Sequence, residues 1–229
     1  MKPIIGIVTR PSKDDIGKTA SVCLDGFRRA LITNGAVPIG IIPPQDVNYV
    51  DTKGSDIGLL TDEDKEVLIR QIELCDGIIF QGGNRWYSYD VFICDYCIKH
   101  NIPSLYICMS MQLLGKTDMM NNEDMRQLIK IEGHKSELDY VHDVTIKKDS
   151  ILFDILGKEK IKVNSRHSYS LPTVYNYDVV AKSDDGIIEG IERKDKRFIL
   201  GLQWHPEMLY STDEDQNRIF KYFIDKCKH

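Results

Sequence analysis

The stretch Ile102–Leu114 (IPSLYICMSMQLL) begins as an apolar strand, breaks at Cys108 and resumes with helix-forming residues. A sharp turn between a strand and a helix exposes the side chain at its apex at the end of a sheet. Far downstream, Gly201–Glu207 (GLQWHPE) supplies a histidine and a carboxylate. A cysteine at a strand end, with a histidine and a carboxylate elsewhere in the chain, can form a catalytic triad. The two stretches together predict a triad of Cys108, His205 and Glu207.

Each member of this triad has a defined chemical task. A free thiol is mostly protonated at neutral pH, and a neighbouring imidazole can accept its proton. A carboxylate on the other ring nitrogen fixes the tautomer and stabilises the imidazolium. Glu207 follows His205 by two residues, so in an extended segment both side chains point to the same side. Taken singly, the cysteine would be a core residue, the histidine a hydrogen-bonded strand end and the glutamate a solvated charge. Their joint context favours catalysis.

Five segments form a recurring family pattern: Pro3–Arg10, Cys75–Gly83, Ile107–Leu114, Val163–His167 and Gly201–Glu207. They resemble the class I glutamine amidotransferase-like domains, and most of all the gamma-glutamyl-gamma-aminobutyrate hydrolase-like peptidases. In order, they resemble the opening strand, the strand before the oxyanion loop, the nucleophile elbow, a substrate-side strand with its loop, and the histidine–glutamate motif. The elbow and the last motif together are specific, whereas an opening strand or a glycine pair alone would be weak.

The resemblance implies acyl transfer through a thioester. Cys108 would attack the side-chain amide carbonyl of a gamma-glutamyl compound. His205 would take the thiol proton and give it to the leaving amine, with Glu207 orienting the imidazole. The backbone N–H groups of Gly83 and Met109 would stabilise the oxyanion, and the resemblance implies no cofactor.

Two further residues are expected on the substrate side. Gln112 lies one helical turn after Cys108 and faces the same way, and His167 falls in the segment that resembles the substrate-side loop. Gln112 could instead be a solvent-facing helical residue, and His167 could be structural. A glycine is expected at Gly83 because the backbone must approach the substrate closely, although a bare glycine pair is equally common in ordinary tight turns.

The chain departs from the family pattern near the elbow. Positions 106 and 110 usually carry glycine in the family, whereas Tyr106 and Ser110 stand here. A bulky Tyr106 is expected either to turn toward the pocket and narrow it, or to relax the elbow and misalign Cys108. The stretch 115–124 lacks the glycine pair of the family, and Ser168 and Tyr169 replace its usual histidine and glutamine.

Three functions are therefore open. The first is a free-standing gamma-glutamyl hydrolase, the second a glutaminase subunit that passes ammonia to a synthase partner. The third is a catalytically weakened relative with a binding or regulatory role, motivated by Tyr106 and the missing glycine pair. The opening strand and the Trp-His-Pro-Glu motif resemble the hydrolase branch more closely.

Strands and helices alternate in the first half of the chain. Strands are predicted at 4–9, 37–42, 77–80 and 103–107, helices at 20–34, 61–74 and 89–100, and a loop at 45–60. Such alternation indicates an α/β fold with a mostly parallel open sheet and helices on both faces, and the resemblance specifies the flavodoxin-like type. The site is expected beyond the carboxyl ends of the strands.

The second half changes to short strand-like runs separated by turns. These runs lie at 141–147, 160–163, 177–182, 186–191 and 198–203, and an amphipathic helix follows at 213–227. They predict a small antiparallel region that returns His205 to the site. With neither an internal repeat nor a convincing linker, residues 1–229 are predicted to form one domain.

Bulk properties narrow the classes of partner. The net charge of −5 at pH 7 gives no support for nucleic-acid or anionic-membrane binding, and no apolar stretch approaches the length of a membrane span. The opening residues do not read as a signal peptide, and the six cysteines lack the spacing of a secreted scaffold. We expect a cytoplasmic protein that binds a small gamma-glutamyl substrate, and a homodimer is compatible with the sequence.

Cysteine and histidine spacing gives no metal signal. Cys94 and Cys97 could be a redox pair or half a zinc site, but they share one face of a predicted helix, and core packing is favoured. The histidines at 134, 142, 167 and 205 have no metal-ligand spacing. The sequence therefore predicts no bound metal.

Overall fold

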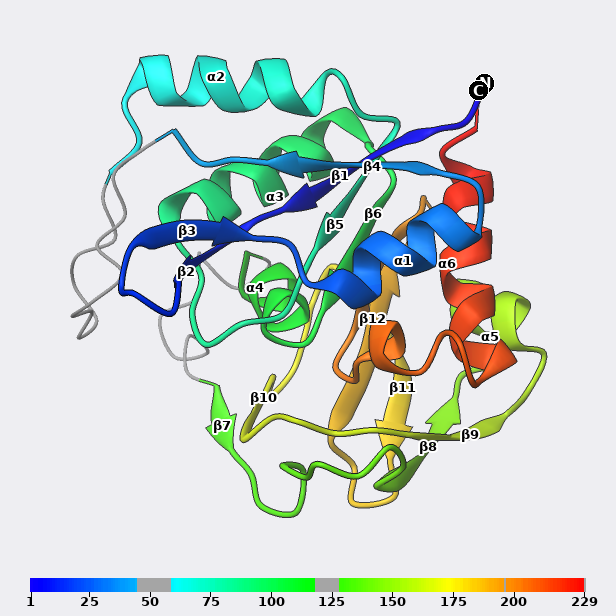
Figure 1. The fold of residues 1–229 in the computed structure, drawn as a ribbon. Helices are drawn as coiled ribbons and strands as arrows, with labels where there is room; N and C mark the ends of the chain where they lie inside the picture. The colour runs from blue at the N-terminus through cyan, green and yellow to red at the C-terminus, as the bar shows by residue number, and fades with distance from the viewer. Residues whose placement is uncertain (45–58, 118–127, 196, 229) are drawn as a thin grey trace.

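The computed structural model describes residues 1–44, 59–117, 128–195 and 197–228, in which nine strands form one large sheet (Figure 1). Five neighbouring strands are parallel: β4 (Val37–Ile41), β1 (Ile4–Val8), β5 (Gly77–Phe80), β6 (Ser104–Ile107) and β13 (Ile199–Leu202). Four strands continue the sheet in antiparallel fashion: β12 (Ile188–Arg193), β11 (Tyr177–Ser183), β8 (His142–Ile146) and β9 (Lys160–Val163). The predicted fold class is confirmed.

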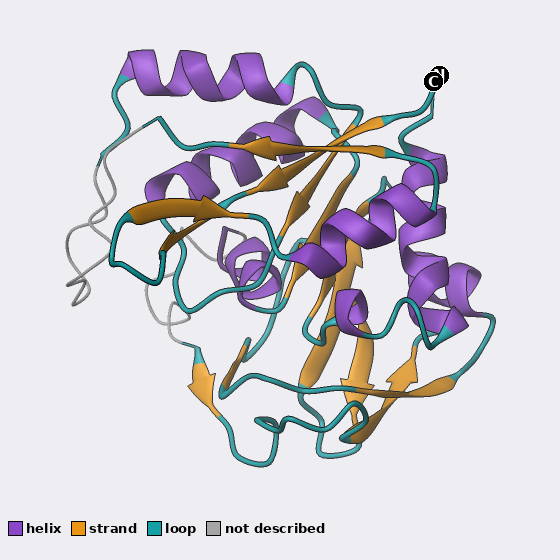
Figure 2. Ribbon diagram, viewed as in Figure 1, coloured by secondary structure: helices purple, strands orange, loops and turns teal. Residues whose placement is uncertain are grey.

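Helices cover both faces of the sheet (Figure 2). One face packs against α1 (Asp25–Thr33), α5 (Ile151–Leu156) and α6 (Glu214–Lys226). The other packs against α2 (Asp62–Ile72), α3 (Ser88–His100) and α4 (Met109–Thr117). Strands β5 and β6 are buried at every residue, as continuous apolar strands are when both faces of a parallel sheet are covered. This arrangement puts the carboxyl ends of the parallel strands at one edge of the core.

The helix predicted over 20–34 is wrong at its start, because α1 begins only at Asp25. Thr19–Val22 forms a strand, β3, which pairs antiparallel with β2 (Arg10–Lys13). The turn between them contains Gly17 at a φ of +81°, a conformation that glycine adopts without steric cost. No residue of the two strands is buried, so the hairpin has no periodic apolar pattern by which to recognise it.

Several boundaries follow from local chemistry. Helix α2 begins as predicted, with the Asp64 N–H donating to Thr61 Oγ1 and the Asp64 carboxylate accepting from the Thr61 N–H. The strand expected from residue 186 begins two residues later, because Gly186 at a φ of +85° makes the preceding turn. Helix α5 was not predicted; Ser150 caps it, and the Glu192 carboxylate accepts two of its first N–H groups.

Smaller elements complete the described chain. Strands β7 (Ile129–Lys130) and β10 (Tyr169–Ser170) pair with each other apart from the main sheet, and η2 (Pro206–Met208) is a short 3₁₀ turn. Residues 45–58 of the predicted loop, and most of the stretch that lacks the glycine pair, lie outside the described residues. None of the helices described has the length and apolar character that a membrane crossing would need. One domain over the whole chain stays a prediction.

Candidate active site

The end of β6 turns sharply into α4 at Cys108. The backbone of Cys108 has a φ of +55°, a left-handed conformation that costs a residue other than glycine about 1–2 kcal/mol. Hydrogen bonds hold it on both sides, because its N–H donates to the Leu202 carbonyl at 2.7 Å and its carbonyl accepts from the Gln112 N–H at 3.2 Å. The neighbouring strand and the following helix thus fix the turn, and the predicted elbow is present.

His205 reaches Cys108 because β13 lies beside β6. The two strands are parallel and Leu202 is paired with Ile107, so the chain continues from both at the same edge of the sheet. His205 Nδ1 lies 2.7 Å from Glu207 Oε1. The expected contact is therefore made, although not through an extended segment: Pro206–Met208 forms the turn η2.

The electrostatics of His205 suit a proton carrier. Burial alone would lower the pKa of the imidazole, but the Glu207 carboxylate and a hydrogen bond with Cys108 raise that pKa well above its usual value. Because Nδ1 is engaged by Glu207, the other ring nitrogen is left for the thiol. The three side chains can therefore hold a proton on the imidazole while the sulfur carries negative charge.

Asn164 fixes the backbone of His205. Its side-chain amide donates to the His205 carbonyl at 2.8 Å, and its Oδ1 accepts the His205 N–H at 2.7 Å. Asn164 is buried directly after β9. Sequence reasoning assigned Asn164 no role. Its place in the segment Val163–His167, which resembles a substrate-side loop, was the feature that could have pointed to it.

The glycine that lies tightly against the triad is Gly82, whereas the expected close approach of Gly83 to the substrate stays a prediction. A Cβ on Gly82 would lie 3.0 Å from His205 Cε1 and 3.4 Å from Cys108 Cβ. A Cβ on Gly83 would meet only ordinary contacts, the nearest at 3.5 Å from the side chain of Arg10. Gly82 therefore needs to be small because the triad lies against it.

Arg10 ties the loop at Gln81–Gly83 to the elbow helix, and sequence reasoning missed it. Its guanidinium donates to the carbonyls of Gln81 and Gly82, to the Ser110 hydroxyl at 3.0 Å, and to the buried Asp90 carboxylate at 2.5 Å. Ser110 in turn donates to the Gln81 carbonyl at 2.9 Å. A lone arginine near a strand end gives no sequence pattern, so only the fold reveals this network.

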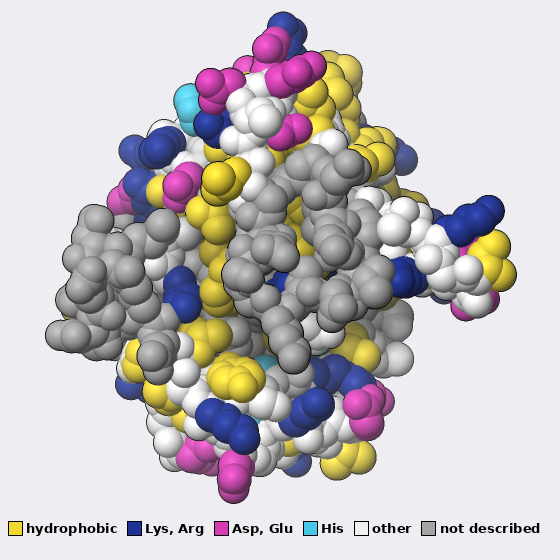
Figure 3. Space-filling model, turned by 90° about the vertical axis from the view of Figure 1, so that its left-hand side faces the viewer, with side chains coloured by type: hydrophobic (Ala, Val, Ile, Leu, Met, Phe, Trp, Pro, Cys, Tyr) yellow, Lys and Arg dark blue, Asp and Glu magenta, His cyan; other side chains and the backbone are white. Residues whose placement is uncertain are grey.

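A pocket of about 700 Å³ opens above Cys108. It brings together five of the predicted site residues: Gly83, Cys108, Met109, Gln112 and His167. Its described lining includes four basic residues, Arg85, Lys116, Lys135 and Arg166, and no acidic one. Lysine and arginine side chains are prominent on the molecular face that carries β7 and β10 (Figure 3). The pocket is therefore suited to an anionic ligand.

Gln112 and His167 lie at the pocket wall with polar atoms turned into the protein. The Gln112 amide donates to the Tyr169 carbonyl at 2.8 Å and to Gln203 Oε1 at 3.1 Å. His167 Nδ1 lies 3.0 Å from the same carbonyl, and its Nε2 lies 3.5 Å from Glu189. Gln112 is buried, so the solvent-facing alternative is wrong. Contact of either residue with substrate stays a prediction.

Tyr106 was expected to narrow the pocket or to relax the elbow, and it does neither. Its ring is fully buried on the opposite face of the sheet from the α1 helix and stacks on Phe80, with 4.3 Å between ring centroids. It is absent from the described lining of the pocket, and Cys108 keeps both its left-handed turn and its hydrogen bond with His205. Tyr106 neither narrows the pocket nor relaxes the elbow, which removes the main motive for a catalytically weakened protein.

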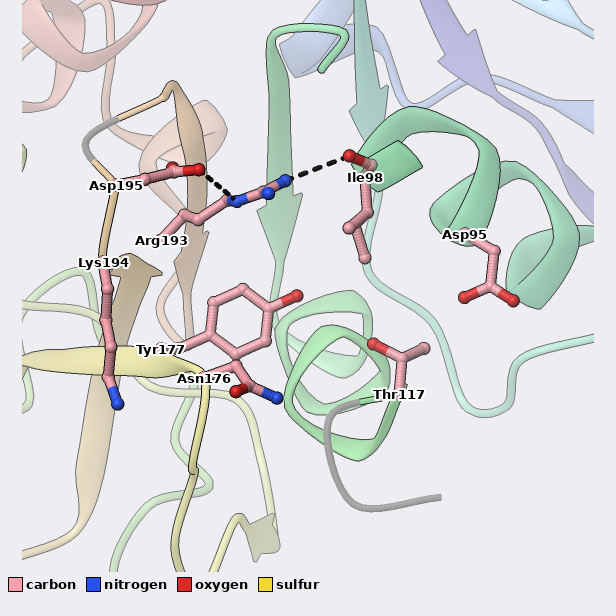
Figure 4. Close-up of a pocket in the computed structure, with 8 residues that line it drawn as sticks. All are labelled: Asp95, Ile98, Thr117, Asn176, Tyr177, Arg193, Lys194 and Asp195. Atoms are coloured by element: carbon pink, nitrogen blue, oxygen red, sulfur yellow. Dashed lines mark hydrogen bonds and ion pairs between the residues drawn. The ribbon is translucent and has the colours of Figure 1, made fainter. Parts of the chain in front are cut away.

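The remaining sequence candidates lie elsewhere. Cys94 and Cys97 are free and fully buried in the helix core, which confirms the core interpretation. A second cavity of about 500 Å³ lies between α3 and the strand ends of β11 and β12 (Figure 4). Its Arg193 guanidinium is held by the Ile98 carbonyl and the Asp195 carboxylate. None of the predicted site residues lines it.

Comparison with curated proteins gives relatives that include glutamine amidotransferase-like proteins and CTP synthases. A Schizosaccharomyces pombe protein named as a candidate glutamine amidotransferase is 32% identical over 178 residues, which span 67% of this chain and 70% of that protein. Protein NtpR of Enterococcus hirae is 29% identical over 146 residues, or 60% and 61% of the two chains. A CTP synthase of Staphylococcus carnosus is 24% identical over 216 residues, which span 77% of this chain and 38% of the synthase.

Solved structures share the fold. The glutaminase domain of Trypanosoma brucei CTPS, with bound acivicin, superposes with a TM-score of 0.69 at 19% identity, covering 99% of this chain and 94% of that one. A glutamine amidotransferase of Thermotoga maritima gives 0.59 at 14% identity, with coverage of 99% and 96%. The family model described as Peptidase C26 matches residues 85–207, which include the elbow and the histidine–glutamate motif. The chain therefore belongs to the Peptidase C26 family within the class I glutamine amidotransferase-like proteins.

Proposed function

We propose that the protein is a cysteine hydrolase that cleaves gamma-glutamyl amide bonds. The observation that carries the proposal is the position of Cys108, held in a left-handed turn beside the paired side chains of His205 and Glu207 and opening into a basic pocket. Membership of a family of amide-cleaving and glutamine-handling proteins supports the reaction class.

The reaction proceeds in two halves. Cys108 Sγ attacks the γ-carbonyl carbon while His205 accepts the thiol proton. The negative charge on the carbonyl oxygen is stabilised by the N–H groups of Gly83 and Met109. As the tetrahedral intermediate collapses, the C–N bond breaks and the amine leaves with the proton from His205. Water then attacks the thioester with His205 as base, glutamate leaves, and the proton returns to Cys108.

The charge of the pocket supports a substrate with carboxylates. A gamma-glutamyl group carries one α-carboxylate, and an amino-acid leaving group carries a second. Lys116 lies over the ring of Trp86, 5.2 Å from its centroid, and burial lowers the pKa of its ammonium group. Arg166 forms an ion pair with Glu137 at the rim. We therefore expect gamma-glutamyl amino acids to be cleaved faster than gamma-glutamyl amides of uncharged amines.

A panel of gamma-glutamyl compounds, paired by size and differing in the charge of the amine, tests this function. The released amine is measured for the natural protein, Cys108→Ala and His205→Asn. Both variants should lose about 10³-fold or more in turnover, since members of a triad act as a unit, while Glu207→Gln should lose less. Undiminished turnover in Cys108→Ala would end the covalent mechanism. Cleavage of other amides but of no gamma-glutamyl compound would end the substrate assignment.

A glutaminase that delivers ammonia to a synthase is the second candidate. Its support is the similarity to CTP synthases and to a glutaminase domain. The two functions differ in what free glutamine does in the assay. A hydrolase releases amines from its substrates unaided, whereas a glutaminase subunit releases ammonia from glutamine at a rate that rises when its synthase partner is added.

A further inference from the structure

Three histidines surround one buried carboxylate of the sheet, and one of them, His167, also lines the pocket above Cys108. Glu189 of β12 is completely buried, and its Oε1 lies 3.1 Å from His134 Nδ1, 3.3 Å from His142 Nε2 and 3.5 Å from His167 Nε2. The side chains of His134 and His167 are 4% and 2% exposed. Spacing along the chain gave no sign of this cluster, which the pairing of the antiparallel strands assembles.

The partners of the other ring nitrogens fix two of the tautomers. His134 Nε2 lies 3.0 Å from an Asp185 carboxylate oxygen, and His167 Nδ1 lies 3.0 Å from the Tyr169 carbonyl. Both partners are acceptors, so each of these nitrogens carries the hydrogen. In a neutral imidazole the remaining nitrogen then has only a lone pair. His134 and His167 therefore direct lone pairs at the Glu189 carboxylate, which also only accepts.

The nitrogens that face Glu189, and both of its carboxylate oxygens, are buried without a hydrogen bond. Such a set of mutually facing acceptors is strongly unfavourable in the protein interior. Added protons or a cation would relieve it: protons would hydrogen-bond the imidazoles to Glu189, and a cation would be bound by the same lone pairs.

The distances between these atoms fit a cation. Zinc bound tetrahedrally by imidazole nitrogen and carboxylate oxygen has bonds of about 2.0–2.2 Å, so neighbouring ligand atoms are about 3.3–3.5 Å apart. The distances from Glu189 Oε1 to His134 Nδ1 and His142 Nε2, 3.1 and 3.3 Å, fall at or close to that separation, and the ligand atoms of all three residues lie within 4.8 Å of one another. The hydrogen bond from the far ring nitrogen of His134 to Asp185 is also the usual support of a metal-binding histidine.

We propose that His134, His142 and Glu189 bind one divalent ion of the zinc type, because one ligand atom of each lies within 4.8 Å of the other two. Three protein ligands leave the fourth position of a tetrahedral shell to a water molecule. None of these three described residues lines the pocket that opens above Cys108, so the ion takes no part in the attack by Cys108. His167, whose Nε2 lies 3.5 Å from Glu189, stands beside this group without belonging to it.

The ion would anchor one wall of the active-site pocket. The His134 carbonyl accepts from the His167 N–H at 3.0 Å and from the Ser165 hydroxyl at 2.6 Å. These contacts join the segments that carry Lys135 and Arg166, both of which line the pocket. Binding to Glu189 would fasten both segments to β12. Loss of the ion should therefore weaken substrate binding more than it slows the chemical step.

The test uses tag-free protein purified without chelator. Elemental analysis should find about one zinc-type ion per chain. After chelation, adding Zn²⁺ should raise the melting temperature, and adding Co²⁺ should produce visible ligand-field absorption of a four-coordinate site. Neither readout depends on enzyme activity, so failure of the proposed function would not affect them. If the chelated natural protein shows no melting shift with Zn²⁺ and no Co²⁺ spectrum, the proposal is wrong.

Matched variants locate the ion. His142→Asn changes the most exposed ligand, at 19%, and should weaken Zn²⁺ binding at least tenfold while the chain still folds. His100→Asn removes an exposed histidine of α3 outside the cluster and should leave binding unchanged. Equal Zn²⁺ affinity in His142→Asn and the natural protein would overturn the assignment. So would a melting temperature indifferent to chelator and Zn²⁺ that falls as the pH rises, because that identifies protonated imidazoles.

Discussion

The positive φ of Cys108 determines the environment of its thiol group. The left-handed turn directs the side chain away from the strand and toward His205, and it places the first turn of α4 directly behind the sulfur. A helix N-terminus favours nearby negative charge, and so does a protonated imidazole. Both lie beside this one cysteine, so the chemistry of the thiol follows from its position in the fold.

Thiol reactivity should therefore be selective. Burial raises the pKa values of the five other thiols: Cys23, Cys75, Cys94, Cys97 and Cys227. Cys108 should be alkylated first in a brief iodoacetamide pulse at neutral pH, because it alone has an imidazole partner at the elbow. Peptide mapping measures this. His205→Asn should slow the labelling of Cys108, and faster labelling of the half-buried Cys23 would contradict the expectation.

Gly82 gives a second test at this scale. In Gly82→Ala the new methyl group would press on His205 and Cys108, and small shifts of reacting groups are costly in rate. We expect turnover to fall roughly tenfold or more with little change in stability. Gly83→Ala is the matched control and should lose less, since its methyl group meets only ordinary contacts. If Gly83→Ala lost more turnover than Gly82→Ala, the conclusion that the tight contact lies at Gly82 would be wrong.

Strand β6 contributes side chains to both cores of the molecule, as its neighbours β5 and β13 also do. Leu105 and Ile107 face the side of the sheet covered by α1 and α6, while Tyr106 faces the side covered by α3. The large ring of Tyr106 thus fills a space between the sheet and a helix, and its size is a packing feature of this strand. Its substitution should be felt as a loss of stability.

Tyr106→Gly should destabilise the protein by about 3–5 kcal/mol, as large-to-small changes of buried aromatic residues do. Tyr106→Phe keeps the ring on Phe80 and loses the hydroxyl, which contacts Ser104 and Cys94, so about 1 kcal/mol is expected. Denaturant unfolding measures both. Faster turnover of Tyr106→Gly with unchanged stability would mean that this side chain obstructs the site after all.

The elements that the sequence reveals are those with local signals. Gly77–Phe80 is a continuous apolar run between helices, and its predicted bounds match β5. Thr61 and Asp64 form a capping box that predicts the start of α2. By contrast, Thr19–Val22 becomes a strand only because Arg10–Lys13 pairs with it. The signals for β5 and α2 lie within a few neighbouring residues. The strand at Thr19–Val22 instead depends on pairing with another segment, and its own sequence has no recognisable pattern.

At the scale of the whole molecule, contacts between distant segments build the site. The triad could be proposed from two motifs, because their residue types carry the chemistry. Arg10, Asn164 and the histidine cluster could not, since their roles depend on which strands become neighbours. Through its one side chain, Arg10 connects the hairpin with the loop at Gln81–Gly83, with α3 and with α4.

Removing Arg10 should therefore destabilise the fold and the site together. Burial raises the pKa of Asp90, which Arg10 opposes, so Arg10→Met leaves a buried carboxylate without its cation. Loss of one partner of a buried ion pair typically costs about 3–5 kcal/mol. The double variant Arg10→Met with Asp90→Asn should regain part of this stability but not the turnover, because the loop at Gln81–Gly83 loses its hydrogen bonds to Arg10. Urea unfolding measures the stability of the variants, and kcat measures their turnover. Additive effects of the two changes would mean that the pair is not coupled.

The place of β13 bears on how much of the chain activity requires. It hydrogen-bonds to β6 on one side and to β12 on the other, yet it follows both in the chain. Any chain that ends before residue 199 lacks the strand that joins β6 to β12. It also lacks His205, which follows shortly after that strand. Under the proposed mechanism such a chain would hold Cys108 without the imidazole that activates it, so activity would require the strand that closes the sheet.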